Sequence, residues 1–357
     1  MGFDLIYRES DPAEFDREAA RYCARRGLDY RYLPRFCSYA RAYSGTIERD
    51  ASFRLEERGE TVGLALVPLE RRDGGLAVSI GGGFVPAPAV EGEAAEHIAF
   101  EHIDAIARTA GASKVAFHAA LSTHAWTWNR LRAHGFIDCS GLDAVVDLTI
   151  DEASLWRTLR KSYKALINKY SDRSGCETIV VDAVRPDHGL HETYRALHAK
   201  CAGRVTRDKA TFDLQYEMLC EGAATFLVMR CRDGVVGCAY FLHNGAAVDY
   251  FSMADDPDFA ALRLPVSHVL VWAAVRHFKA RGFSLLRLSP PAGFSPVEGF
   301  GDYADAKGLG IAHFKHGVAT RIVTGFRGTR YYDAQAFERD LEAFRAAFYG
   351  ANEPIER

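Results

Sequence analysis

Phe53–Glu70, FRLEERGETVGLALVPLE, and Phe226–His243, FLVMRCRDGVVGCAYFLH, share the pattern that decides the fold. Each stretch predicts a strand, a turn that contains glycine, and a second strand that begins at Val-Gly, which together are typical of a β-hairpin. Gly63 in the first stretch corresponds to Gly237 in the second, 174 positions later. The same hairpin therefore occurs twice in the chain.

The elements that follow each hairpin also repeat. Long helices are predicted over residues 93–110 and 264–281, and each is followed by glycine, as is usual after the last helical residue. The next stretches, GASKVAFHAA from Gly111 and GFSLLRLSPP from Gly282, predict strands 171 positions apart. Because a strand–helix–strand unit crosses over to a parallel pairing, each half predicts a mixed sheet. We therefore expect an α/β protein (α+β, with mixed sheets) made of two tandem domains from an internal duplication.

The expected boundary lies near residue 150, which gives a first domain of residues 1–150 and a second of residues 151–357 that ends in a helix. A linker helix is predicted over 151–175, DEASLWRTLRKSYKALINKYSDRSG, with Asp151 as a good N-cap residue. Apolar residues at helical spacing give this helix one buried face. Its other side is either a solvated face or a surface for a polyanion, and its basic residues are Arg157, Arg160, Lys161 and Lys164.

The composition of the 357 residues excludes some classes of function. The chain is 48% hydrophobic and 25% charged with a formal net charge of −3, so no overall charge attracts DNA or a membrane surface. The eight cysteines form no CxxC pair and no cluster with histidine, so we expect reduced thiols, a cytoplasmic location and no metal site. We also expect no secretory signal, and no membrane span because no stretch of about 20 apolar residues occurs. The sequence gives no indication of the oligomeric state.

Several stretches resemble one family of transferases. The segment DLTIDEASLWRTLRKSYKALINKY, residues 147–170, resembles the entry to the second half of FemAB-like transferases, where an Asp-Leu strand leads to Leu-Trp and a basic helix. The Val-Gly hairpins, SHVLVWAAVRHFKARG at 267–282 and HFKHGVAT at 313–320, resemble the same family in the same order. The resemblance covers most of the chain. It implies two GNAT-like domains and the transfer of an acyl or aminoacyl group to an amine.

The resemblance also implies substrates. In this family the donor is commonly an aminoacyl-tRNA and the acceptor a peptidoglycan precursor, and relatives modify other amines. The present sequence departs from the family at 285–291, where LLRLSPP replaces the usual acidic-Leu-Gly-Gly end of a strand. It also lacks the helical coiled-coil insertion that aids tRNA contact in some members. The implied acceptor is thus an amine-bearing small molecule or a glycan or peptide precursor, with tRNA as a possible partner.

The loops before the two long helices bear on the choice of donor. A CoA-binding GNAT loop holds pyrophosphate on successive backbone N–H groups, which glycines expose, at the start of the helix. The loop at 255–268, DDPDFAALRLPVSH, has no glycine and three aspartates, and Pro265 lacks an N–H group. The loop at 80–92, IGGGFVPAPAVEG, has glycines but also two prolines. Neither loop has the usual CoA pattern, which favours an aminoacyl-tRNA over acyl-CoA as donor, with no tightly bound cofactor.

Lys315 is the candidate catalytic residue. Aminolysis of an ester or thioester requires that the amine lose a proton and that the developing oxyanion be stabilised. Lys315 in HFKHG resembles the Phe-Lys pair at the family's substrate channel, and we assign it the oxyanion or leaving-group role, with Phe314 as a pocket wall. The alternative is a solvated lysine at the end of a strand. His313 and His316 flank the pair and are candidate bases.

The stretch GRVTR at 203–207 interrupts a helical pattern with two arginines around a hydroxyl. Guanidinium groups bind phosphate in a bidentate manner, and the family has a basic residue near this helix that holds acceptor phosphates. We interpret the loop as an anion clamp, and the alternative is a set of salt bridges to Asp208 or Glu221. The candidate clamp residues are Arg204, Thr206, Arg207 and Gln215.

Four further residues are candidates for the walls of the substrate cleft. Tyr250, in VDYFSMA, occupies the central strand position from which GNAT-like sheets splay, unless it only packs in the core. His268 lies near the start of the second long helix. Tyr32 and Arg35, in DYRYLPRF, would supply a matching wall from the first half.

Three functional interpretations follow. The first is a FemAB-like transferase that forms an amide from an aminoacyl-tRNA or another activated acyl donor. The second is an acyl-CoA-dependent N-acyltransferase of the same fold that acts on an amino sugar or amino acid. The third is a protein that binds an anionic glycan or peptide without turnover.

Overall fold

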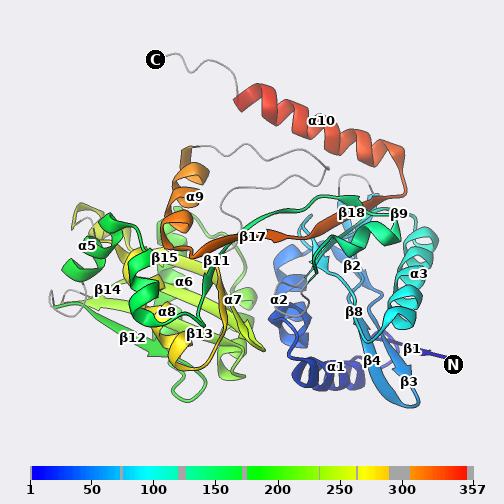
Figure 1. Ribbon diagram of the computed structural model, residues 1–357, viewed down its shortest axis with the longest axis horizontal. Coiled ribbons are helices and arrows are strands. Elements are labelled where there is room, and N and C mark those ends of the chain that lie inside the picture. The colour runs from blue at the N-terminus through cyan, green and yellow to red at the C-terminus, as the bar shows by residue number, and fades with distance from the viewer. Residues whose placement is uncertain are drawn as a thin grey trace. The chain divides into compact units, whose positions relative to one another are not determined.

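The computed structural model describes residues 2–72, 75–119, 126–170, 175–232, 234–262, 264–288 and 306–351, and Figure 1 labels its helices and strands. The chain folds into two compact units. The first unit comprises Met1–Leu142, Pro290–Ala312 and Thr324–Arg357, and the second comprises Asp143–Ser289 and His313–Val323.

The first unit contains a four-stranded sheet of order β1-β3-β4-β8 and a sheet of order β10-β18-β9-β6-β5-β2, with β7 paired to β9. The predicted hairpin is β3 and β4, and the predicted long helix is α3. The elements are β1 (Asp4–Tyr7), α1 (Pro12–Arg26), a 3₁₀ helix (Tyr30–Tyr32), α2 (Pro34–Ser44), β2 (Ile47–Asp50), β3 (Phe53–Glu57), β4 (Glu60–Ala65), β5 (Pro68–Arg72), β6 (Gly75–Val78), β7 (Val85–Pro86), β8 (Ala89–Val90), α3 (Glu93–Thr109), β9 (Ala112–His118), a 3₁₀ helix (Arg130–His134), β10 (Ile137–Asp138), β18 (Arg327–Tyr331) and α10 (Ala334–Ala351).

The second unit is built on one seven-stranded sheet of order β12-β13-β14-β15-β16-β11-β17. The predicted hairpin is β13 and β14, and the second long helix is α8. The elements are β11 (Gly141–Asp147), α4 (Glu152–Thr158), α5 (Lys161–Tyr170), β12 (Glu177–Val181), α6 (His188–Ala202), α7 (Lys209–Cys220), β13 (Ala224–Cys231), β14 (Gly234–Asn244), β15 (Ala247–Asp255), a 3₁₀ helix (Pro257–Leu262), α8 (Val266–Ala280), β16 (Leu285–Arg287), α9 (Ala306–Val318) and β17 (Arg321–Gly325).

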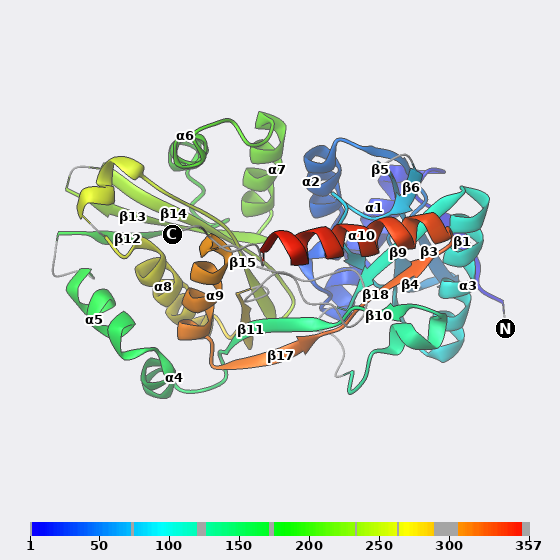
Figure 2. The same ribbon diagram turned by 90° about the horizontal axis from the view of Figure 1, so that it is seen from above.

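Helices cover both faces of this second sheet. Figure 2 shows α6 and α7 on one face and α5 and α8 on the other. On the α8 face, a hydrophobic core separates the sheet from the helices, and its members Phe241, Val248 and Phe278 are fully buried. The parallel pairing of β15 with β16 across α8 confirms the predicted crossover.

The glycine of each Val-Gly pair has the same physical role. In the second unit, a Cβ on Gly237 would overlap Cγ1 of Val266, the first residue of α8, and would lie 3.2 Å from the carbonyl oxygen of Ala254. In the first unit, a Cβ on Gly63 would lie 2.8 Å from side-chain atoms of both Leu55 and Val90. These hairpins repeat a glycine because another element packs directly on the backbone there.

The units do not follow the expected division at residue 150. Strand β11, from before that boundary, pairs with β16 in the sheet of the second unit. Strand β18, from the C-terminal part of the chain, pairs with β9 and β10 in the first unit. Residues 324–357, including the C-terminal helix α10, therefore belong to the first unit because β18 satisfies the backbone groups of β9.

The linker helix predicted over 151–175 is two helices rather than one. Asp151 caps α4 as expected, with its carboxylate accepting a hydrogen bond from the Ser154 N–H. The backbone of Leu159 is extended, and the N–H of Arg160 donates to the carbonyl of Gly317 in α9 at 3.0 Å. A hydrogen bond to a distant element therefore replaces the helical one, and α5 begins afresh at Lys161.

Two of the eight cysteines form a disulfide. Cys176 precedes β12 and Cys231 ends β13, and their Cα atoms are 4.0 Å apart across the antiparallel pair. The expectation that all the cysteines are reduced thiols is thus wrong for this pair, which the pairing of two neighbouring strands brings together. Six cysteines are free.

Candidate active site in the second unit

β15 and β16 form a short parallel pair in the sheet of the second unit. Among the described residues they pair through Ala247–Asp249 and Leu285–Arg287. On the other side of β16, the N–H of Leu288 donates to the Ala144 carbonyl at 2.9 Å and extends the pairing with β11. A buried ion pair between Asp249 and Arg287 lies at the last paired residues. Tyr250 is the first residue of β15 beyond this described pairing, and its role at a splayed position stays a prediction.

A β-bulge lies at the same point of β15. Tyr240 on β14 is opposite Ser252, whereas the next residue, Phe241, is opposite Tyr250, so Phe251 is the extra residue. The Tyr250 hydroxyl donates to Sδ of Met253 at 3.2 Å, and both side chains pack on the α8 face of the sheet. Burial raises the pKa of Tyr250, so its hydroxyl remains protonated.

The first turn of α8 lies beside the end of β15. No side chain caps this turn, which begins after Pro265. Asp255 is paired with Gly237, and Val266 packs over Gly237, which places Asp255 next to the helix N-terminus. Burial raises the pKa of the Asp255 carboxyl. Sequence reasoning considered Asp255 only as a group that repels phosphate, whereas a half-buried carboxyl with a raised pKa is suited to proton transfer.

Three aromatic rings from three helices meet near this turn. His268 of α8 contacts Tyr163 of α5 and Phe314 of α9 in edge-to-face geometry, with ring centroids 4.3 and 5.0 Å apart. The Tyr163 hydroxyl donates to the His313 carbonyl at 3.3 Å. Two residues expected at the site, His268 and Phe314, are therefore adjacent. Burial lowers the pKa of His268, which favours the neutral imidazole.

Tyr163 was missed as a site residue because it appeared only as one of the apolar positions of the linker helix. A signal was present in HFKHG, where Gly317 interrupts a helical stretch. A Cβ on Gly317 would lie 2.7 Å from Cζ of Tyr163 and would overlap the ring, so only glycine admits Tyr163 here. The same cluster includes Arg160, whose guanidinium contacts the His313 ring.

Lys315 lies in the last turn of α9, next to Phe314. The alternative interpretation, a solvated lysine at the end of a strand, is wrong because the residue is helical and half-buried. Burial lowers the pKa of Lys315, and the negative charge of Asp143 opposes this effect. The ammonium group is therefore partly desolvated, which strengthens its interaction with a nearby negative charge.

The candidate clamp residues separate into an inner and an outer pair. Arg207 donates to Gln215 Oε1 at 2.7 Å and to the Tyr194 hydroxyl at 3.2 Å, and its guanidinium stacks on Phe212 at 3.9 Å. Gln215 is fully buried. Thr206 instead bonds to His198 at 3.1 Å, and the Arg204 side chain is exposed. The two arginines thus differ in environment, and only Arg204 lies wholly at the surface.

Arg207 is linked to the bulged strand. The Tyr194 hydroxyl, which accepts from Arg207, bonds to the Ser252 hydroxyl of β15 at 2.6 Å. Ser252 is two residues from Tyr250. Sequence reasoning missed Tyr194 and Ser252 because each reads as an ordinary core position.

Tyr32 and Arg35 lie in the first unit. Tyr32 is 4% exposed, and its hydroxyl donates to the carbonyl of Ala87. It fills the core of the first unit, so the expectation that its ring lines a substrate cleft is wrong. Arg35 lies in the first turn of α2.

The two loops considered for CoA have unexpected partners. In the second unit, Lys200 of α6 pairs with both Asp256 and Asp258, at 2.5 and 2.6 Å, which offsets their charge. In the first unit, the N–H groups of Gly81 and Gly82 donate to the buried Glu70 carboxylate, each at 2.9 Å. A carboxylate of the chain itself thus occupies the place of an external anion in the glycine loop. Ser289, Pro290 and Pro291 lie outside the described residues.

Glu70 is expected to stabilise the first unit through this arrangement. Three hydroxyl groups, from Ser44, Thr46 and Ser79, also donate to it, and these bonds lower its pKa to about 2. Glu70→Gln should lower the free energy of unfolding at pH 7 by about 3 kcal/mol, because a buried charged acceptor is lost.

The same change has a defined pH dependence. Because the folded-state pKa of Glu70 is depressed, its contribution is present above pH 4.5 and is lost as pH falls toward about 2. Urea unfolding at several pH values should show the two proteins converging over that range. A difference that stays constant would show that Glu70 acts through shape rather than charge.

Comparisons with known proteins agree with this architecture. Residues 157–303 match the acetyltransferase (GNAT) domain family. The structure of FemX is similar over 95% of this chain and 99% of that one, with a TM-score of 0.65 and 11% identity. The C-terminal domain of a putative lysylphosphatidylglycerol synthetase from Agrobacterium fabrum is similar over 94% and 95%, with a TM-score of 0.57 and 16% identity. A tandem GNAT protein from the clavulanic acid biosynthesis pathway is similar over 92% and 98%, with a TM-score of 0.50 and 11% identity.

The chain has the GNAT fold, and the acetyltransferase match covers most of its second unit. The similar structures, which include a tandem GNAT protein, span nearly the whole chain, and this confirms the expected fold class. A comparison with curated proteins gives no match. Among the described residues, no helix has the length and apolar character needed to cross a membrane.

Proposed function

We propose that the protein is a FemAB-like transferase that forms an amide by moving an aminoacyl or acyl group to an amine acceptor. The observation that carries the proposal is that the second unit has the bulged strand β15, with Tyr250, beside the α8 N-terminus and its neighbour Asp255. The aromatic cluster that carries Phe314, beside Lys315, lies at the same helix.

The reaction assigns a role to each group. The amine nitrogen attacks the acyl carbon, and the bond from that carbon to the donor's ester oxygen or thioester sulfur breaks. The Lys315 ammonium stabilises the negative charge that develops on the carbonyl oxygen or on the leaving atom. The Asp255 carboxylate takes the proton that the amine loses, and this proton ends on the leaving oxygen or sulfur. Arg204, Thr206 and Arg207 hold an anionic part of the acceptor.

The preferred donor is an aminoacyl-tRNA, and the preferred acceptor is a peptidoglycan or other cell-envelope precursor that carries an amine. The support is the similarity to FemX and the lack of a glycine-rich loop before α8. A tRNA donor would also require that the protein act in the cytoplasm.

A CoA-dependent N-acyltransferase is the second candidate. Two observations favour it: the first turn of α8 has no side-chain cap, and the aspartates before it are paired with Lys200. Uncapped N–H groups at a helix N-terminus are suited to binding pyrophosphate.

Calorimetric titration separates the two donors. Acetyl-CoA is expected to give no saturable heat, whereas a mixture of aminoacylated tRNAs should support transfer to an amine. Lys200→Ala provides a matched test, because it leaves Asp256 and Asp258 uncompensated and should weaken CoA binding further. Micromolar binding of acetyl-CoA that Lys200→Ala abolishes would contradict the tRNA proposal and establish the second candidate.

A further inference from the structure

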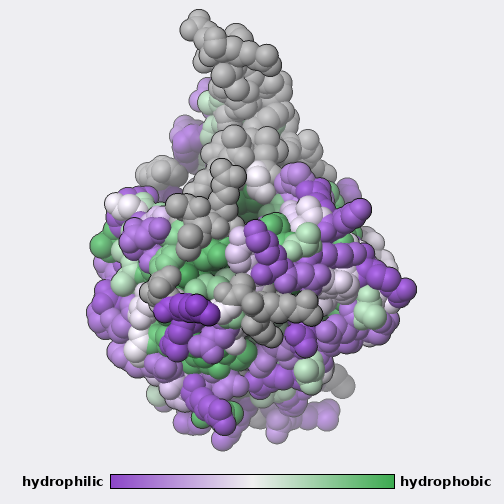
Figure 3. All heavy atoms as spheres, turned by 90° about the vertical axis from the view of Figure 1, so that its left-hand side faces the viewer, coloured by the Kyte–Doolittle hydropathy of each residue, from purple (hydrophilic) through white to green (hydrophobic). Residues whose placement is uncertain are grey.

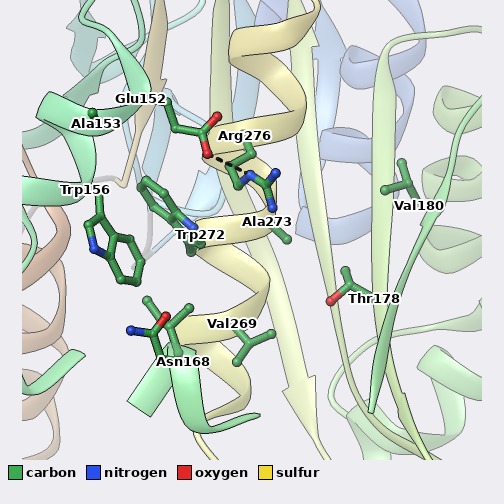
Figure 4. Close-up of a pocket in the computed structure, with 11 residues that line it drawn as sticks. Glu152, Ala153, Trp156, Asn168, Thr178, Val180, Val269, Trp272, Ala273 and Arg276 are labelled. Atoms are coloured by element: carbon green, nitrogen blue, oxygen red, sulfur yellow. Dashed lines mark ion pairs between the residues drawn. The ribbon is translucent and has the colours of Figure 1, made fainter. Parts of the chain in front are cut away.

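Hydrophobic atoms reach the surface of the second unit in patches bordered by hydrophilic ones (Figure 3). One described groove, of about 740 Å³, lies between α4, α5, β12 and α8. Figure 4 shows Trp156 of α4 and Trp272 of α8 side by side on one wall, with Val269 and Asn168 below them. This volume lies within the range of about 300–1,000 Å³ that is usual for ligand sites.

The lining of the groove is mostly apolar and only partly covered. The indoles of Trp156 and Trp272 contact each other, with centroids 4.9 Å apart, and both side chains are half-buried. Ile167 of α5 and Val180 of β12 contribute branched aliphatic side chains, and Val180 is 38% exposed. Ala153 of α4 is small, so the groove stays open at that helix. An apolar ligand would remove these surfaces from water.

A basic stripe leads to the groove along α5. Lys161, Lys164 and Asn168 follow one another at helical spacing, so they share one face, and Asn168 lines the groove. At the other end of the groove, Glu152 pairs with Arg276 at 3.0 Å, and these two charges offset each other. The Lys164 ammonium donates to the Arg157 carbonyl at 2.9 Å, and no carboxylate among the described residues pairs with Lys161 or Lys164, so net positive charge lies at the α5 end.

This α5 end is also the end nearest the candidate active site. Ile167 is one helical turn from Tyr163, and Val269 directly follows His268. Tyr163 and His268 are the residues whose rings meet beside Phe314.

We propose that this groove binds the alkyl tail of an anionic amphiphile, with the anionic head on Lys161 and Lys164. Charge complementarity requires an anion, and the aliphatic lining favours an alkyl chain. A polynucleotide would also meet the lysines, but the two indoles contact each other and leave no gap for a base between them. That the amphiphile is the acceptor rests on the proposed function, whereas the binding itself does not.

Dodecyl phosphate, below its critical micelle concentration, is the probe for calorimetric titration of the full chain. We expect saturable 1:1 binding that weakens by up to about fourfold for each methylene removed, as tested with decyl and octyl phosphate. Dodecyltrimethylammonium, with the same tail and a positive head, should bind at least tenfold more weakly. Equal affinity for dodecyl phosphate and dodecyltrimethylammonium would overturn the assignment of the head group to Lys161 and Lys164.

Matched variants locate the probe. Ala153→Phe should weaken binding at least tenfold by filling the groove, whereas Ala196→Phe, on an exposed position of α6 that does not line it, should have no effect. Val180→Asn, at an exposed strand position, provides a second groove variant if Ala153→Phe fails to fold. Lys161→Gln with Lys164→Gln should weaken binding, and Lys209→Gln on α7 should not. Binding that neither groove variant alters would overturn the proposal.

Three further outcomes separate the possibilities. A 12-nucleotide RNA that binds in place of dodecyl phosphate, and whose binding Ala153→Phe abolishes, would overturn the amphiphile in favour of a polynucleotide. Amphiphile binding without any transfer activity would support the groove and contradict the proposed function. Transfer activity without amphiphile binding would contradict the groove and leave the proposed function in place.

Discussion

Replacing Lys315 with alanine is expected to lower kcat/KM for transfer by about 10²- to 10³-fold, the usual effect of removing one preorganised donor to a developing oxyanion. Lys315 lies beside Phe314 in the last turn of α9, where burial lowers its pKa. Because its charge acts mainly in the transition state, donor affinity should change little. Steady-state transfer kinetics give kcat/KM, and equilibrium binding on the same preparation gives the affinity for the donor.

The neighbouring residue supplies the control for this change. His316→Ala alters an exposed side chain one position away, and with Asp255 as the proposed base it should leave kcat/KM within about twofold. A loss as large as that of Lys315→Ala would instead support His316 as the base. Unchanged turnover in Lys315→Ala would remove Lys315 from the mechanism.

The titration of Lys315 predicts the alkaline side of the pH profile. Burial depresses its pKa below the ordinary value of 10.5, so the charged form is present at low pH and is lost as pH rises through that lowered pKa. Activity should therefore fall at a pH below 10.5. In Lys315→Arg the guanidinium stays charged, and the alkaline fall that depends on this group should disappear while part of the activity remains.

Replacing Gly317 with alanine is expected to destabilise the second unit by about 1–3 kcal/mol, as overpacking of a buried site usually does. The added Cβ would overlap the ring of Tyr163, which is held between His268 and Phe314. Tyr163 has to move, and the aromatic cluster beside Lys315 moves with it. Transfer activity should therefore fall together with the free energy of unfolding, which urea titration measures.

The same helix contains a matched glycine. Nothing lies within 4 Å of a Cβ placed on Gly310, so Gly310→Ala should be neutral or stabilising by up to about 1 kcal/mol. Combining Gly317→Ala with Tyr163→Ala should cost less than the sum of the single changes, because the clash no longer exists. Equal stability of the Gly317→Ala and Gly310→Ala variants would show that Tyr163 has space to adjust.

The sequence predicted the parts of the fold that depend on local pattern. Both Val-Gly hairpins and both long helices form where the spacing of apolar residues and glycines places them. The assignment of β11 to the second unit and of β18 to the first was not predictable, because a strand pattern does not identify its partner, which for β18 lies more than 200 positions away. The end of α4 at Leu159 was not predictable for the same reason, because it depends on the hydrogen bond from the Arg160 N–H to the distant Gly317 carbonyl.

In the candidate site, too, the sequence does not reveal contacts between residues that are distant in the chain. Tyr250, His268, Phe314 and Lys315 could be proposed from the sequence because each occupies a recognisable place in a motif, and their roles stay predictions. Tyr32 was misplaced, because nothing in DYRYLPRF reveals that Ala87 accepts a hydrogen bond from its hydroxyl. Arg207 was expected to face a ligand, and its contacts with Tyr194 and Gln215 depend on the packing of α6 against α7 and β15.

The pairing of β18 with β9 has a consequence for biosynthesis. The first unit lacks this strand until residue 331 has emerged from the ribosome. The backbone N–H and C=O groups on one edge of β9 therefore stay unpaired while the second unit is synthesised. A fragment that ends at residue 150 would lack the strand permanently and would expose the same edge to other chains. Folding of the first unit is therefore a late event, and any truncation before β18 should favour aggregation over a separate, stable N-terminal half.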